Sequence, residues 1–391
     1  MKKLLKRICK APIFILALPC VFVIRLLKPV VWIRFFPILP RIGHAAANVE
    51  SYLLERKAGM HEPKAIDIFF PCYGSGANRQ LVKMWSRVIP VIEPVKWLAW
   101  ANNKIPGGQV HFKDSGESFG REPYGFGDQS APLVSFTPEE QEQGKELLKK
   151  MGIGSKPFVC FYARDNKFLQ HHFPEDDWSY HNYRDANIDN YVDAVNYLVD
   201  RGYYAVRVGK LVSKPFVLVK EGVIDYSTGP WRSDFADLYL LSQCRYFVGQ
   251  GAGLEAVARL FRKPQVLLNY IPLNLLIAWS KNDLMIFKKL WLKKEKRFMS
   301  FREIKDSELG MALGEDVYQR WDVEVVENSP EEIRDAVVEM DERLNGTWQT
   351  NDEYEFLQGR FWAMFKPDRW NKVFRARVGS KFLMQNQDLL K

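Results

Sequence analysis

The feature that most constrains this chain is the regular alternation of short apolar runs with amphipathic stretches across residues 158–268. The apolar runs predict strands at residues 158–163, 203–208, 223–226, 245–248 and 265–268. The stretches between them predict helices at residues 188–201, 233–243 and 254–261. Strands that alternate with helices are joined by right-handed crossovers, so we expect a parallel, doubly wound α/β sheet.

A chain of 391 residues exceeds what one hydrophobic core usually supports, so we expect more than one domain. An apolar run at 65–70, a glycine turn at 74–76 and a helical pattern over 78–91 predict half of a βαβ unit. A capped helix is predicted to begin after Thr137, with Pro138 at its first position. We divide the chain into a membrane-associated segment (1–40), an N-terminal Rossmann-like domain (41–155), a C-terminal Rossmann-like domain (156–330) and C-terminal helices that could pack back across both domains (331–391).

The net charge of +9 is concentrated at the N-terminus of the chain. Residues 1–49 hold nine lysines and arginines and no acid, and the remaining 47 basic residues match the 47 acidic ones. A protein that binds duplex nucleic acid usually carries a basic face on its folded domain. We therefore expect no nucleic-acid partner.

The N-terminal segment has the composition of a membrane-associated anchor. Residues 11–24 form an apolar run of 14 residues, which is shorter than the roughly 20 residues of a spanning helix. A second apolar stretch at 29–40 is interrupted by Arg34 and contains prolines. This pattern favours a monotopic segment that lies in the interface of a membrane with anionic lipids, on its cytoplasmic face. A short tilted span and a helix that docks on the protein's own body are the alternatives.

The cysteines and histidines form no metal-binding pattern. The five cysteines are widely spaced without a CxxC, which favours small buried side chains and a reducing compartment. His171 and His172 are adjacent, and no HExxH pattern accompanies them. We expect no bound metal and no cofactor.

Polar residues follow four of the predicted strands of the second domain. Arg164 follows 158–163; Arg207 and Gly209 end 203–208; a glycine turn with Gln250, Gly251 and Gly253 follows 245–248; and Asn269 follows 265–268. Ligands of open parallel sheets bind at the carboxyl ends of the strands. A glycine turn before a helix can hold phosphate, and arginine binds diphosphate oxygens in a bidentate manner. A purely structural turn, and an Arg164 that only pairs with Asp165, are the alternatives.

The segment 181–185 places several hydrogen-bonding side chains in one loop, namely His181, Asn182, Arg184 and Asp185. Loop residues at this density usually serve binding or catalysis rather than packing. The alternative is a solvated loop whose Asp185 or Asn187 caps the next helix.

Two further residues are candidates for chemistry. Lys288, or its neighbour Lys289, follows the apolar run 284–287 and could contact an anionic donor. His44 lies where the anchor gives way to the first domain, and its ordinary pKa near neutrality suits a base for an acceptor hydroxyl. A capping or core histidine is the equally open alternative.

These residues resemble those of a largely uncharacterised family of bacterial glycosyltransferases encoded among surface-polysaccharide functions. The resemblance covers the chain from about residue 41 and includes RIGHAAANVE, FVCFYARD, HNYRDANIDNYVDAV, DLYLLSQCRYFVGQGAGLEAVARLFRKPQVLLN and SKFLMQN. The donor domain of that family is similar to that of GDP-fucose-dependent fucosyltransferases, which have the GT-B architecture of two facing Rossmann-like domains. Their diphosphate-binding arginine corresponds to Arg164 and their phosphate turn to residues 251–255. They carry a histidine where Tyr162 stands here, so the donor does not carry over.

The resemblance implies a metal-independent glycosyltransferase of the bacterial inner membrane, which transfers a sugar from a nucleotide sugar to a saccharide or lipid-linked acceptor. The expected catalytic residues are His44 and Arg164. The expected donor-binding residues are Arg164, His181, Asn182, Arg184, Asp185, Arg207, Gly209, Gln250, Gly251, Gly253, Glu255, Asn269 and Lys288. A noncatalytic binding component of an export assembly is the alternative. A dinucleotide oxidoreductase is disfavoured, because the turn at 74–79 lacks the third glycine of GxGxxG.

Overall fold

The computed structural model describes residues 11–73, 77–113, 121–172 and 174–391. The chain divides into two compact units, Met1–Glu122 with Leu133–Ser135 and Pro123–Pro132 with Phe136–Lys391. This division differs from the boundary we predicted at residue 155. The glycine turn at 74–76 and the basic residues among 1–10 lie outside the described residues.

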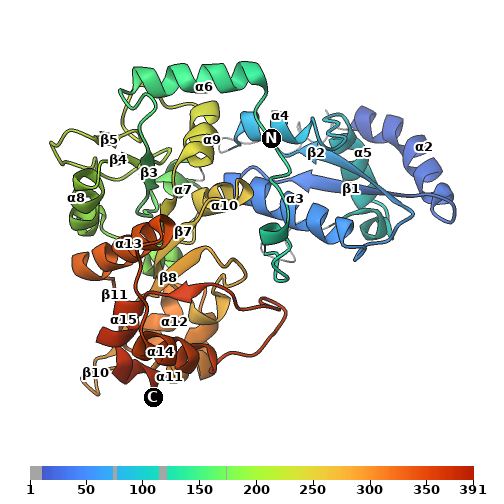
Figure 1. The fold of residues 1–391 in the computed structure, drawn as a ribbon. Coiled ribbons are helices and arrows are strands. Elements are labelled where there is room, and N and C mark those ends of the chain that lie inside the picture. The colour runs from blue at the N-terminus through green and yellow to red at the C-terminus, as the bar shows by residue number, and fades with distance from the viewer. Residues whose placement is uncertain (1–10, 74–76, 114–120, 173) are drawn as a thin grey trace. The chain divides into compact units, whose positions relative to one another are not determined.

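The C-terminal unit is built on a parallel sheet of seven strands in the order β12-β8-β7-β6-β3-β4-β5 (Figure 1). Every neighbouring pair in this sheet is parallel. The strands are β3 (Phe158–Phe161), β4 (Tyr204–Arg207), β5 (Val223–Asp225), β6 (Phe247–Gly249), β7 (Gln265–Tyr270), β8 (Asp283–Phe287) and β12 (Arg377–Val378). The α/β class and the parallel, doubly wound sheet predicted from the sequence are thereby confirmed.

Helices accompany the sheet, and its central strands are correspondingly buried along their length. Every residue of β3, β6, β7 and β8 is buried, as expected when helices cover both faces of a parallel sheet. The helices are α6 (Pro138–Lys150), α7 (Lys167–His172), α8 (Val192–Asp200), α9 (Asp234–Gln243), α10 (Gly253–Leu260), α11 (Phe301–Asp306), α12 (Glu315–Arg320), α13 (Pro330–Asn345), α14 (Asp352–Trp362) and α15 (Ser380–Gln385). A small antiparallel sheet contains β9 (Lys289–Leu292), β10 (Arg297–Phe298) and β11 (Val323–Val326).

Local sequence explains where α6 begins and where it packs. The Thr137 side chain accepts from the backbone N–H of Glu140, and the Glu140 side chain accepts from the backbone of Thr137, which is the predicted capping box. A Cβ at Gly144 would lie 1.9 Å from the ring of Tyr239 on α9. Glycine therefore permits the close approach that joins α6 to the C-terminal unit.

The N-terminal unit contains a βαβ unit. Strands β1 (Trp32–Ile38) and β2 (Ala65–Pro71) pair in parallel, and the chain between them forms α3 (Ile42–Lys57). Isolated bridges extend the pairing from Phe35 to Phe112 and from Phe69 to Val91. The described part of this unit also contains the helices α2 (Ala11–Leu27), α4 (Arg79–Trp85) and α5 (Val95–Asn103).

Strand β1 corrects our placement of residues 29–40 in a membrane interface. Phe35, Phe36 and Ile38 are each at most 1% exposed and belong to the core of the unit. A short apolar run with aromatic residues has the same pattern in an interfacial segment and in a buried parallel strand. Only its pairing with β2 distinguishes the two.

Helix α2 docks on the N-terminal unit by one face. Its Phe14 ring meets the ring of Trp100 edge-on at 5.7 Å, and the Arg25 guanidinium donates to Asn102 Oδ1 at 2.9 Å and to Pro106 O at 2.8 Å. The other face exposes large apolar side chains: Ile15, Leu16, Phe22, Val23, Leu26 and Leu27. Among the described residues, no helix combines the length and the hydrophobicity that a membrane span needs.

Candidate functional site

The strand order creates a switch point between β3 and β6. From β3 the chain adds β4 and β5 on one side of the sheet, and from β6 it adds β7 and β8 on the other. Crossovers that leave in opposite directions open a crevice at the carboxyl ends of the two central strands, where open α/β sheets bind ligands. Arg164 follows β3 and Gln250 follows β6, so both residues lie at this switch point.

Arg164 is held at the switch point by three neighbouring segments. Its backbone N–H donates to Gln250 Oε1 at 2.5 Å, which links the two strand ends directly. Its guanidinium donates to His181 O at 3.3 Å and forms an ion pair with Asp185. Arg164 is 5% exposed, and a charged side chain is rarely buried to this extent unless it has a specific partner.

The loop that carries the predicted HNYRD motif is fastened to the same strand ends. Gln250 Nε2 donates to Arg184 O at 3.1 Å, and the Arg184 guanidinium donates to Gly251 O. Lys288, directly after β8, donates from Nζ to Asp185 O at 2.5 Å. The structure therefore brings together seven of the predicted site residues: Arg164, His181, Arg184, Asp185, Gln250, Gly251 and Lys288.

Burial dominates the electrostatics of this group, which we call the cationic cluster. Burial raises the pKa of Asp185 to about 6 and lowers the pKa of Lys288 to about 8. The pKa of Arg164 is lowered, first by burial and then by the neighbouring charge of Arg184. Each charged form is thus less stable here than in water.

The cationic cluster holds more positive than negative charge. Of its three cationic side chains, only Arg164 forms an ion pair with the Asp185 carboxylate, whereas Arg184 donates to Gly251 O and Lys288 donates to Asp185 O. The nearby Asp165 accepts the backbone N–H groups of Lys167 at 3.0 Å and Ser213 at 2.8 Å. A ligand with several anionic oxygens would supply the missing compensation.

Other predicted donor-binding residues have partners elsewhere. Arg207 is 1% exposed and donates to Lys214 O at 2.7 Å and to Asp225 Oδ2 at 3.3 Å, so it fastens the loop after its own strand. Asn269 and Asn328 exchange hydrogen bonds, each backbone N–H donating to the other's side-chain oxygen, at 2.6 and 2.7 Å. Both arrangements hold neighbouring segments together, and the contact of these two residues with a donor stays a prediction.

The remaining candidates contribute in other ways. Glu255 pairs with Arg259 one turn later on α10, at 2.7 Å, and Asn182 Oδ1 accepts from Asn166 Nδ2 at 2.9 Å. Gly253 is the first residue of α10. Gly209 lies close to Val212, because a Cβ added at Gly209 would be 3.1 Å from Val212 Cγ1. Their contact with a donor stays a prediction.

His44 lies on α3 of the N-terminal unit. Burial lowers its pKa, and the charge of Arg41 lowers it further. A neutral imidazole can accept a proton at neutral pH, so this environment is compatible with the predicted base. Its catalytic role stays a prediction.

An aromatic stack beside the cationic cluster was not among our candidates. In the segment 178–181, the Trp178 and His181 rings are parallel with centroids 6.1 Å apart, and the Tyr180 and His181 centroids are 3.9 Å apart. Tyr180 is 42% exposed, so one aromatic side chain of the stack is open to solvent. The aromatic density of Trp178-Ser179-Tyr180-His181 was the available sequence signal.

Among the described residues, no group of three or more histidine, cysteine, aspartate or glutamate side chains is placed to hold a metal ion. His171 and His172 lie at the end of the short helix α7 with their rings at 87°. Metal independence therefore remains an expectation from the sequence.

Comparisons with known proteins give remote structural similarity. No family model and no curated protein matches the sequence. The structure is similar to a glycosyl transferase family 9 protein of Veillonella parvula (11% identity, 66% of this chain, 86% of that chain, TM-score 0.38). It is also similar to the ADP-heptose LPS heptosyltransferase II of E. coli (15% identity, 79% and 100%, TM-score 0.37).

A third similar structure is the iron-containing dodecameric glycosyltransferase TibC of enterotoxigenic E. coli (15% identity, 60% of this chain, TM-score 0.31). The matched region spans 57% of the length of TibC. At this level of similarity, function has to be derived from the residues of this chain.

Proposed function

We propose that the protein is a glycosyltransferase of the GT-B class, which transfers a sugar from a nucleotide sugar to a saccharide or lipid-linked acceptor in the synthesis of bacterial surface polysaccharide or lipopolysaccharide. The observation that carries the proposal is the under-compensated cationic cluster at the switch point between β3 and β6. A nucleotide diphosphate carries the negative charge that would compensate the cluster, and its oxygens can bond arginine in a bidentate manner.

The cluster would act on the leaving group. When the acceptor oxygen forms its bond to the anomeric carbon, the bond from that carbon to the diphosphate breaks and negative charge accumulates on the departing oxygen. Preorganised cations at that position stabilise the transition state more than the ground state. Arg164, Arg184 and Lys288 are the residues that we propose for this role, and His44 is the proposed acceptor of the hydroxyl proton.

The aromatic stack gives the nucleoside a place beside its phosphates. Tyr180 lies one residue before His181, whose carbonyl accepts from Arg164. We propose that the nucleobase stacks on the exposed ring of Tyr180, because flat apolar rings pair favourably in offset stacks.

We also propose that the protein works at the cytoplasmic face of the bacterial inner membrane. The apolar face of α2, with Leu16 at 76% and Leu26 at 79% exposed, would insert into the interface, and the basic N-terminal residues would favour anionic lipids. The Leu16→Ser/Leu26→Ser double variant should lose binding to phosphatidylglycerol-containing vesicles in a sedimentation assay. Unchanged binding would contradict this placement. Truncation at residue 40 is not a usable test, because it removes β1.

The decisive experiment combines binding and turnover. Calorimetry with UDP, GDP, CMP and ADP should identify one nucleotide that binds the full chain and that loses affinity in Arg164→Ala. A radiolabelled sugar of that nucleotide, incubated with membrane extract, should then label an acceptor. Binding without any turnover would favour the noncatalytic alternative, and no nucleotide binding would overturn the proposal.

A further inference from the structure

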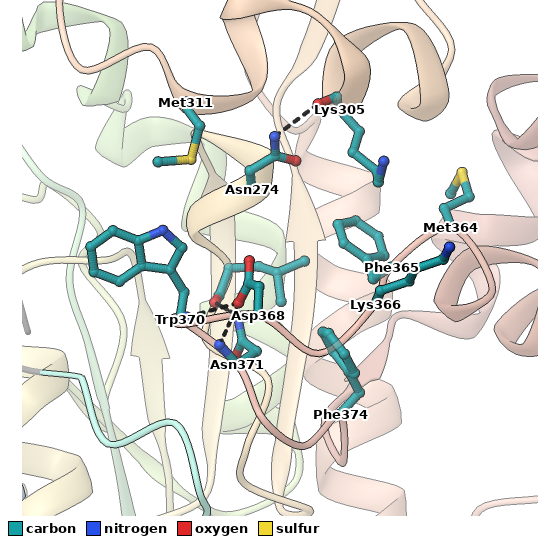
Figure 2. A pocket seen from close by; sticks show the side chains of 11 residues that line it. Asn274, Lys305, Met311, Met364, Phe365, Lys366, Asp368, Trp370, Asn371 and Phe374 are labelled. Atoms are coloured by element: carbon teal, nitrogen blue, oxygen red, sulfur yellow. Dashed lines mark hydrogen bonds between the residues drawn. The ribbon is translucent and has the colours of Figure 1, made fainter.

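A cavity lies in the C-terminal unit and shares no lining residue with the cationic cluster. Its volume is about 530 Å³. One wall comes from Asn274 of the short 3₁₀ turn Leu273–Leu275 and from Lys305 and Met311 (Figure 2). The facing wall comes from residues that precede β12, namely Met364, Phe365, Lys366, Asp368, Trp370, Asn371 and Phe374. Pockets of this size accommodate small organic ligands.

Aromatic rings form much of the facing wall. Phe365 and Phe374 lie with centroids 6.1 Å apart, and Trp362 packs against both from outside the lining, at 6.0 and 5.5 Å. Trp370 is 8% exposed, so its ring is held in place. The wall is therefore a supported aromatic surface rather than a set of mobile side chains.

Polar side chains lie among these rings (Figure 2). Asn274 Nδ2 donates to Lys305 O at 2.8 Å, which fixes the orientation of the amide. Its Oδ1 is buried and accepts no hydrogen bond from the described residues. This oxygen is covered by the protein, so the cavity presents the fixed amide of Asn274 as part of its wall and not as a free acceptor.

Asp368 and Lys366 add an acceptor and a donor. One carboxylate oxygen of Asp368 accepts the backbone N–H groups of Trp370 at 2.7 Å and Asn371 at 2.8 Å, which holds the carboxylate in place. Lys366 is exposed and forms no ion pair within the described part of the chain. Lys305, in contrast, is paired with Asp306 at 2.5 Å.

The aromatic rings and charged side chains of the cavity favour one class of ligand over others. A nucleotide or phosphate would require an excess of cations, and here Asp368 balances Lys366 while Asp306 balances Lys305. A lipid chain would offer no hydrogen-bonding group to the Asp368 and Lys366 side chains that line the cavity. A pyranose matches both the rings and the charged groups, because its C–H faces pack on aromatic rings while its hydroxyls donate to Asp368 and accept from Lys366.

We propose that this cavity is a saccharide-binding site that holds a short oligosaccharide, separate from the nucleotide site. It deepens the proposed function, on which it rests for the source of the saccharide: the acceptor would be an extended glycan that contacts the enzyme at a second point. Such a second contact raises the effective concentration of the growing chain without any change at the reacting atoms.

The experiment measures saccharide binding directly on the full chain. Saturation-transfer NMR and calorimetry with maltotetraose, cellotetraose and mannotetraose at millimolar concentrations should show binding of at least one of them. Phe374→Leu, which keeps apolar packing but removes the ring, and Lys366→Ala should each weaken that binding by about tenfold, or about 1.4 kcal/mol.

Two matched controls lie outside the cavity. Phe356→Leu removes a phenylalanine that is 64% exposed on α14, and Lys372→Ala removes an exposed lysine near Lys366; both should bind saccharide normally. Nucleotide affinity should be unchanged in all four variants, which separates this proposal from the proposed donor site. Absence of binding by all three saccharides, or equal binding by the cavity variants and the controls, overturns it. If Phe374→Leu fails to fold, saccharide binding by Lys366→Ala, a change at an exposed residue, still tests the proposal.

Discussion

The two units of the molecule each contain a buried arginine paired with an aspartate, and the two pairs differ in how completely they are satisfied. In the N-terminal unit, Arg34 on β1 faces Asp67 on β2 in the strand register, with Nε to Oδ1 at 2.8 Å. Tyr52 and Arg56 also donate to Asp67. In the C-terminal unit, Arg164 shares Asp185 with Lys288, which bonds the carbonyl of Asp185, while Arg184 adds a further positive charge.

The pKa shifts of the two arginines have opposite directions. Burial acts to lower the pKa of Arg34, but the hydrogen bonds and charge of Asp67 outweigh it, and the net pKa is raised. At Arg164, burial and the charge of Arg184 outweigh Asp185, and the pKa is lowered. A pair that compensates itself holds two strands together, whereas an under-compensated group is suited to receive an anion.

The largest expected effect comes from removing the shared acceptor of the N-terminal pair. Asp67→Ala leaves Arg34 buried without its partner, so the free energy of unfolding should fall by about 3–5 kcal/mol. The measurement is urea denaturation followed by circular dichroism. Asp185→Ala is the matched change in the other unit, and it should cost much less, because burial already raises the pKa of Asp185 to about 6. Equal losses would remove the distinction between the pairs.

Arg164→Ala should act on activity rather than on folding. Loss of one preorganised charge at a leaving group lowers kcat by about 10²–10³-fold, or about 2.7–4 kcal/mol. Turnover of the labelled donor measures this effect. Arg207→Ala is the control on the neighbouring strand: Arg207 bonds only Lys214 and Asp225 in the described structure, so its loss should lower stability more than kcat in the folded fraction.

Nucleotide binding at the cationic cluster should depend on alkaline pH. Because burial lowers the pKa of Lys288 to about 8, the lysine loses its charge as pH rises through that value, and nucleotide affinity should fall by about tenfold. Lys288→Met should bind weakly at every pH and lose this alkaline dependence. An affinity profile that is flat across pH 8 in the unmodified protein would contradict the role of Lys288.

The smallest expected effect sharpens the comparison within the N-terminal pair. Tyr52→Phe removes one hydroxyl that donates to Asp67 and that accepts from Arg34 Nη2 at 2.6 Å. Because Arg34 and Arg56 still bond the carboxylate, the free energy of unfolding should fall by only about 1 kcal/mol. Thermal unfolding measures this change, and nucleotide affinity should not move. A loss as large as that of Asp67→Ala would mean that the hydroxyl, and not the ion pair, holds the strands.

The sequence by itself determined several of the strands and helices of the C-terminal unit. The strands expected at 203–208 and 265–268 are observed as β4 and β7, and the helix after Thr137 is observed as α6. Apolar periodicity and capping residues are local signals, so they place these elements to within about two residues. The same signals suggested which residues follow the strands, and four of those candidates, Arg164, Gln250, Gly251 and Lys288, meet at the switch point with residues of the loop 181–185.

Tertiary structure alone decided which polar residues remain available. The local sequence does not distinguish Arg164, which lies at the switch point, from Arg207, whose guanidinium donates to Lys214 O and Asp225 Oδ2. Likewise, the pattern of residues 32–38 does not predict that they pair with β2. No sequence motif predicts the cavity beside Asn274. Charge compensation and burial depend on partners distant in sequence, and those partners meet only when the chain folds.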